Sequence, residues 1–142
     1  MLFQAKTSAL LLIDLQVGFC SPAGHTGQRT DVSGFEPVLQ SAKRLADSSR
    51  KAGMPVIFTT MAFASDYSNG GLTTSELRPN LSEENALRAD RPDRNIMPSL
   101  EVHSSDIIIE KQRYSAMIKS PLPDLLQQQK IESLVVGGVT TS

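Results

Sequence analysis

The sequence predicts an α/β fold, an open and mostly parallel sheet flanked by helices on both faces. Short runs of apolar residues recur at four places along the 142 residues, and segments with helical spacing separate them. A parallel strand with helices on both faces has this continuous apolar composition, because neither of its sides meets water. Strands that alternate with helices are typical of a layered α/β domain. We therefore expect residues 1–142 to belong to a single domain.

The first expected strand covers residues 9–13 (Ala-Leu-Leu-Leu-Ile) and ends at Asp14. Residues 18–34 contain glycine, proline and serine, and they predict a long loop. An amphipathic helix is expected over residues 35–52, where apolar side chains recur on one stripe. Gly53 is a natural helix stop. The β-branched run at residues 56–60 predicts the second strand and completes a strand–helix–strand unit.

Residues 61–105 are polar and irregular, with charges of both signs. A solvated surface excursion is the plainest interpretation, and a lid over a substrate is the alternative. The third strand is expected at residues 107–109, ending in Glu110 and Lys111. A helix follows, with Ser120 as its N-cap and Pro121 at its first position. The fourth strand, residues 134–136, leads into the segment 137–142.

The composition excludes several classes of protein. Fourteen basic residues oppose fifteen acidic ones, which gives a net charge of -1 and no electrostatic basis for binding nucleic acid or an anionic membrane. The apolar runs are too short to span a bilayer. A single cysteine, Cys20, forms no internal disulfide and no thiolate metal cage. We expect a cytoplasmic protein with neither nucleic acid nor membrane as a partner.

Polar residues at the carboxyl ends of parallel strands meet at one edge of the sheet, where ligands bind in such folds. Asp14, Lys111 and the 137–142 turn occupy these ends. From spacing alone, Asp14 and Lys111 form either a structural ion pair or a general base beside a cation. Cys20 is a weak candidate nucleophile, and spacing does not support a metal site built on His25 and His103.

Three blocks of the chain, in this order, resemble the isochorismatase-like cysteine hydrolases. The blocks carry the strand-end aspartate, the lysine with its Arg-Tyr-Ser-Ala sequence, and the glycine turn after the fourth strand. They are Ala9 to Gln16 with Phe19, Ile109 to Met117 with Ser120 to Leu122, and Leu134 to Ser142. The resemblance runs over the whole chain and implies the family's three-layer, Rossmann-like sandwich.

The resemblance implies a Cys–Asp–Lys triad in which Asp14 is the general base and Lys111 the lysine. It also implies a cis peptide between Val139 and Thr140, with the amide of Thr140 in an oxyanion hole. The family's nucleophilic cysteine stands two residues beyond Ser142, and Cys20 is not its equivalent. We therefore expect residues 1–142 to be the N-terminal part of a longer protein.

The expected activity is hydrolysis of a small amide or ureido substrate through a thioacyl intermediate. The Thr-Thr-Ser sequence at residues 140–142 is similar to the branch with N-carbamoylsarcosine amidase and maleamate amidohydrolase, and ureidoacrylate amidohydrolase remains open. We expect Phe19, Tyr114 and Gln16 to contact the substrate, although core packing explains the two aromatic side chains equally well. Residues 59–64 lack the Asp-x-His metal motif of nicotinamidases, so no metal and no other cofactor is expected.

Two other functions remain open. True isochorismatases share the Arg-Tyr-Ser-Ala sequence but cleave a vinyl ether, often without the cysteine. A pseudoenzyme or assembly module would keep the fold and lack the nucleophile. The resemblance further implies a homo-oligomer.

Overall fold

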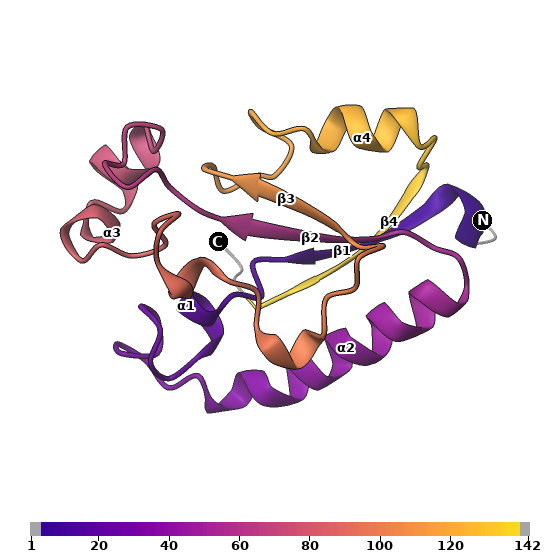
Figure 1. Cartoon of the computed structure of the whole chain (residues 1–142), viewed down its shortest axis with the longest axis horizontal. Coiled ribbons are helices and arrows are strands. Elements are labelled where there is room, and N and C mark those ends of the chain that lie inside the picture. Colours follow the sequence, from indigo (N-terminus) through magenta and orange to yellow (C-terminus); the bar gives the residue numbers. More distant parts are fainter. Residues whose placement is uncertain (1–3, 140–142) are drawn as a thin grey trace.

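The computed structural model describes residues 4–139 and contains one four-stranded parallel sheet in the order β3-β2-β1-β4 (Figure 1). The strands are β1 (Ser8–Ile13), β2 (Val56–Met61), β3 (Ile107–Lys111) and β4 (Ser133–Gly138). All four predicted strands are present, and the predicted α/β class is confirmed. Strand β1 pairs with β2 on one side and with β4 on the other, so β1 is an interior strand of the sheet.

Two helices cover opposite faces of this sheet (Figure 1). Helix α2 (Glu36–Lys51) lies where a helix over residues 35–52 was expected, and it is followed by Gly53 with φ of 71°. This left-handed conformation favours glycine and ends the helix. Helix α4 (Leu122–Gln128) lies on the other face and buries Leu122 and Leu126, one turn apart.

The remaining helical segments are short and lie mostly in the connections. They are α1 (Val17–Cys20), α3 (Asn80–Glu83), a π-helical turn at Thr73–Leu77, and 3₁₀ turns at Ala5–Thr7, Ser33–Phe35, Pro92–Arg94 and Pro98–Leu100. Helix α1 lies partly within the loop predicted for residues 18–34, so the start of that loop was predicted wrongly. A four-residue helix gives too little periodicity for sequence patterns to detect. Within residues 4–139, no helix has the length and apolar character needed to cross a membrane.

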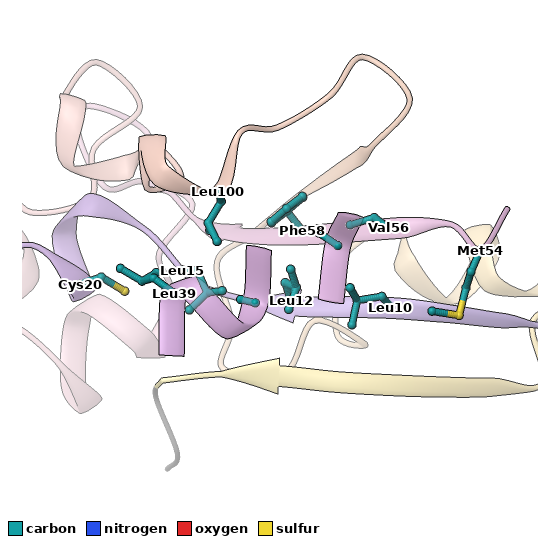
Figure 2. Packing of buried hydrophobic residues seen from close by; sticks show 11 residues of the cluster. Leu10, Leu12, Leu15, Cys20, Leu39, Met54, Val56, Phe58 and Leu100 are labelled. Carbon is teal, nitrogen blue, oxygen red and sulfur yellow. The ribbon is translucent and has the colours of Figure 1, made fainter. Parts of the chain in front are cut away.

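The main core lies between the sheet and α2, as Figure 2 shows. Leu10, Leu12 and Phe58 of the strands belong to one buried cluster with Leu39 of the helix, and all four are almost fully buried. A second cluster on the opposite face joins Leu11 and Ile57 to the leucines of α4. Each fully buried leucine or phenylalanine stabilises the fold by about 1.5–3 kcal/mol, so these two layers fix where the strand ends lie.

The prediction that every strand is buried on both faces was wrong for β3 and β4. Strands β1 and β2 are buried almost throughout. Strand β3 is buried only at Ile109 and Lys111, and β4 alternates between partly buried and exposed residues. The physical reason is the strand order, because β3 and β4 are the edges of this sheet. Ile108 and Val136 are accordingly more than half exposed.

The start of α4 also differs from the prediction. Ser120 was predicted as the N-cap with Pro121 at the first helical position, but Pro121 is the N-cap and the helix begins at Leu122. The Ser120 hydroxyl still accepts a hydrogen bond from the Leu122 N–H at 3.1 Å. The serine therefore satisfies a free backbone donor of the first turn from one position further out.

Candidate active site

Asp14 is the first residue after β1, and its backbone is left-handed with φ of 54°. Aspartate tolerates this conformation better than most residues, although it still costs free energy. The Asp14 N–H donates to the Thr59 carbonyl at 3.2 Å, which continues the β1–β2 pairing by one residue. The carboxylate is buried with it, at 4% exposure for the whole residue.

Lys111 ends β3 and is 1% exposed. Its ammonium lies 2.7 Å from Asp14 Oδ2 and donates to the carbonyls of Arg113 and Tyr114 at 3.2 Å each. An ammonium group has three donors, so all three are engaged here. The structure therefore brings the two predicted strand-end residues into one buried ion pair, even though β2 lies between their strands.

Thr59 of β2 completes this arrangement, and sequence reasoning missed it. Its hydroxyl donates to Asp14 Oδ1 at 2.8 Å and lies 3.3 Å from the Asp14 N–H. One carboxylate oxygen thus faces a hydroxyl and the other an ammonium, which fixes the plane of the carboxylate. The position of Thr59 near the end of a strand was the available signal, but threonine in a strand usually reflects β-propensity alone.

Gln16 is fully buried, two residues after Asp14. Its amide oxygen accepts from the Met61 N–H at 2.7 Å, and its amide nitrogen donates to the carbonyls of Met61 and Arg94 at 2.9 and 2.6 Å. The side chain therefore joins the turn after β1 to the end of β2 and to the Pro92–Arg94 turn. No part of Gln16 faces solvent, and its expected contact with the substrate stays a prediction.

The two aromatic residues expected at the substrate lie in different surroundings. Tyr114 is 44% exposed, its carbonyl accepts from Lys111, and its hydroxyl accepts from Arg78 Nε at 3.0 Å. It lines an open groove of about 530 Å³. Phe19 is partly buried and packs against the main core and against the cluster around Phe63 and Leu87. Phe19 is not among the residues that line the groove.

The predicted oxyanion residue, Thr140, and the predicted cis peptide between Val139 and Thr140 lie outside the described residues. Val139 itself is partly buried against the main core. Strand β4 ends at Gly138, which is opposite Ile13 in the register. A Cβ at position 138 would lie 2.8 Å from the Ile13 carbonyl oxygen, so the close approach of these two backbones requires glycine.

Cys20 is 4% exposed and belongs to the main core beside Leu15 and Leu39 (Figure 2). Burial raises the pKa of its thiol to about 11. A thiol with this pKa is a poor nucleophile near neutral pH, because the thiolate is the reactive form.

His25 and His103 do not meet. His25 Nδ1 lies 3.0 Å from Glu84 Oε2, and burial lowers the pKa of the His25 imidazole. The His103 N–H donates to Asp106, just before β3 and hence at the opposite end of the sheet from Lys111. Within residues 4–139, no group of three or more His, Cys, Asp or Glu side chains is arranged to hold a metal ion.

The chain is similar to proteins whose sequences or structures are known. The ureidoacrylate amidohydrolase RutB of Cronobacter sakazakii is 29% identical over 155 residues, covering 99% of this chain and 66% of that protein. The chain therefore spans about two thirds of the length of this relative.

Two solved structures share the fold. A cysteine hydrolase from Pseudomonas syringae pv. phaseolicola superposes with a TM-score of 0.87 at 25% identity, covering 97% of this chain and 62% of that one. The N-carbamoylsarcosine amidase from Thermoplasma acidophilum superposes with a TM-score of 0.70 at 18% identity, covering 93% and 67%, and at that identity it supports the fold alone.

The isochorismatase domain model matches residues 8–142, from the first residue of β1 onward. This match contains Asp14, Thr59 and Lys111, which form the buried cluster at the carboxyl ends of three adjacent strands. The chain belongs to the isochorismatase family.

Proposed function

We propose that the protein is a cysteine-dependent amidohydrolase that cleaves a small amide or ureido substrate. The buried Asp14–Lys111 pair is the observation that carries this proposal. It supplies a carboxylate and a cation, held at the edge of a parallel sheet where ligands bind. The similarity to a ureidoacrylate amidohydrolase favours a substrate of that chemical class.

In the proposed reaction, Asp14 takes the proton of a cysteine thiol, and the thiolate attacks the substrate carbonyl. Backbone amides hold the resulting oxyanion, and Thr140 is the proposed donor within this sequence. The C–N bond then breaks, and Asp14 gives the proton to the leaving nitrogen. Water, deprotonated by Asp14, attacks the thioacyl group and regenerates the thiol and a carboxylic or carbamic acid.

Lys111 has a different role in this scheme. All three of its donors are engaged by Asp14 and by two carbonyl groups, so it does not hydrogen-bond the substrate directly. Its positive charge lies beside the carboxylate and favours an anionic thiolate nearby. Its contacts with Arg113 and Tyr114 also tie the following loop to the site.

The nucleophile of this proposal is a cysteine two residues beyond Ser142, and not Cys20. Cys20 is packed in the core with its pKa raised by burial to about 11. Cys20→Ser thus provides a protein in which any reactive thiol is a different one.

The test is ammonia release from a panel of small amides and ureides, measured on the natural protein expressed from its own reading frame. We expect activity in Cys20→Ser and its complete loss after alkylation of that variant with iodoacetamide. Ammonia release that survives complete alkylation would contradict the cysteine mechanism. Cleavage of isochorismate that survives alkylation, with no amide hydrolysed, would favour vinyl-ether hydrolysis of the isochorismatase type. Hydrolysis of no amide, with isochorismate also inert, would favour the pseudoenzyme alternative.

A further inference from the structure

The loop after β2 contains the only asparagine–glycine step in the sequence, at Asn69–Gly70. The other three asparagines precede leucine, alanine and isoleucine. Asparagine before glycine is especially susceptible to spontaneous deamidation, because glycine lacks a Cβ and leaves its backbone nitrogen open to the neighbouring side chain. Asn69 is exposed, so solvent reaches this step.

The reaction needs only the chain itself and water. The Gly70 backbone nitrogen bonds to Cγ of Asn69, and its proton leaves with the side-chain amide nitrogen as ammonia. Water then opens the resulting succinimide at either of its carbonyl groups. One product is aspartate, and the other is isoaspartate, in which the peptide bond to Gly70 runs through the former side chain.

The folded turn holds both reacting groups in other contacts. The Gly70 N–H donates to the Tyr67 carbonyl at 2.9 Å, and Asn69 Oδ1 accepts from the Ala64 N–H at 2.9 Å. Formation of the succinimide removes the N–H and consumes the side-chain amide, so it is incompatible with these two hydrogen bonds. The turn therefore has to open locally before Asn69 reacts.

Packing explains why glycine stands at position 70. Gly70 is buried, and a Cβ there would overlap the side chain of Thr74. Thr74 is itself 8% exposed, so it has little room to move away. The fold thus retains a dipeptide that is chemically reactive when the turn is open.

Arg113, from the loop directly after β3, holds this turn closed. Its Nη1 donates to the carbonyls of Asn69 and Gly70, at 3.2 and 2.7 Å, and to the Gln112 carbonyl at 2.9 Å. Hydrogen bonds from a charged donor are roughly twice as strong as neutral ones. The Arg113 carbonyl in turn accepts from Lys111 at 3.2 Å. One residue therefore joins the reactive step to the buried ion pair.

A second set of contacts docks the same loop. The Thr73 hydroxyl donates to the Gln112 carbonyl at 3.0 Å, and Gln112 Nε2 donates to the Ala62 carbonyl at 3.1 Å. Residues on both sides of Asn69–Gly70 are thus bound to the loop that supplies both carbonyl acceptors of Lys111.

We propose that Asn69–Gly70 is a latent deamidation site that Arg113 keeps closed. The rate of deamidation then measures how often the loop after β3 leaves the turn, because one guanidinium holds both carbonyls of the step. Deamidation adds a negative charge to a residue that Arg113 contacts. The site is independent of the proposed amidohydrolase function, and so is its test.

The measurement is peptide mapping of protein aged at mildly alkaline pH. Trypsin does not cut before proline, so the bond between Arg78 and Pro79 stays intact and residues 52–88 form one peptide. This peptide contains Asn80 and Asn85 beside Asn69, and these two serve as internal references. Fragment masses locate each converted asparagine, and an isoaspartyl methyltransferase detects the isoaspartate product.

Arg113→Gln removes both contacts with the turn, and the matched control Arg91→Gln removes the same charge from another exposed arginine. Arg113→Gln should raise the rate of Asn69 conversion about tenfold or more, since one hydrogen bond from a charged donor accounts for a factor of that size. Arg91→Gln should match the unmodified protein. Thr73→Val loosens the same loop without removing a contact of the Asn69 or Gly70 carbonyl, so it should also raise the rate, and it replaces Arg113→Gln if that variant does not fold.

Three results would overturn the inference. They are conversion of Asn69 in the folded, unmodified protein as fast as in the urea-unfolded chain, equal rates in folded Arg113→Gln and Arg91→Gln, and conversion of Asn80 or Asn85 ahead of Asn69. A faster conversion in Arg113→Gln alone supports the inference whether or not any amide is hydrolysed. Failure of the proposed reaction therefore leaves this result unchanged.

Discussion

Two adjacent threonines of β2 should respond in opposite ways to the same substitution. Thr59 donates its hydroxyl to Asp14 Oδ1 at 2.8 Å. Thr60 is 4% exposed, and within the described residues its hydroxyl has no hydrogen-bond partner. Replacing either with valine keeps the β-branched shape and exchanges the hydroxyl for a methyl group. The pair thus isolates the hydrogen bond to the carboxylate.

The structure sets the expected magnitudes. Thr59→Val removes a hydrogen bond to a charged group, which contributes about 1.5–3 kcal/mol, while the Asp14 N–H keeps its bond to the Thr59 carbonyl at 3.2 Å. The free energy of unfolding should fall by about 2 kcal/mol. Thr60→Val removes a buried hydroxyl that lacks a partner, so the free energy of unfolding should rise by about 1 kcal/mol.

Urea unfolding followed by circular dichroism measures both changes. A total difference of about 3 kcal/mol corresponds to transition midpoints at least about 1 M apart at ordinary m-values. Equal destabilisation by both valine substitutions would show that the Thr59–Asp14 hydrogen bond does not stabilise the fold.

Three further predictions concern the buried polar groups. Gln16→Leu removes three hydrogen bonds, which leaves the Met61 N–H and C=O and the Arg94 C=O without this partner. The free energy of unfolding, measured by urea titration, should therefore fall by about 2–4 kcal/mol. An unchanged free energy of unfolding would contradict a stabilising role for these three hydrogen bonds. Cys20 has a pKa raised by burial to about 11, so only about one thiol in a thousand is ionised at pH 8, and Ellman's reagent should label it quickly only after unfolding. Burial raises the pKa of Asp106, but hydrogen bonds from Arg50 and the His103 N–H outweigh it and leave the pKa below 3.8. Because the folded pKa is depressed, this stabilisation is present above about pH 4 and is lost as pH falls through the folded value; Asp106→Asn should flatten the acid limb of stability against pH, and an unchanged limb would refute the assignment.

The sequence alone predicted that Asp14 and Lys111 lie close together. Both follow apolar strands, and the carboxyl ends of parallel strands share one edge. The buried character of β1 and β2 followed from their continuous apolar runs. The same runs in β3 and β4 were misinterpreted, because apolar composition does not distinguish an edge strand from a central one.

The sequence did not predict the contacts of Thr59, Gln16 and Arg78, for a different reason. Gln16 bonds to Arg94, 78 residues away, and Arg78 bonds to Tyr114, 36 residues away. Both partnerships depend on the path of the irregular 61–105 segment, which has too little periodicity to place its side chains. Thr59 needed the β1–β2 register, which sets it opposite Ile13 and beside Asp14.

The most direct test of the proposed chemistry compares two buried aspartates in the natural protein. Asp14 pairs with Lys111 at the carboxyl ends of the strands, and Asp106 pairs with Arg50 at 2.6 Å near the amino ends. The measurement is kcat for amide hydrolysis in Asp14→Asn and Asp106→Asn. We expect a loss of about a hundredfold or more for Asp14→Asn and nearly unchanged kcat for folded Asp106→Asn. Equal kcat values in the two variants would contradict the role of Asp14 as the general base.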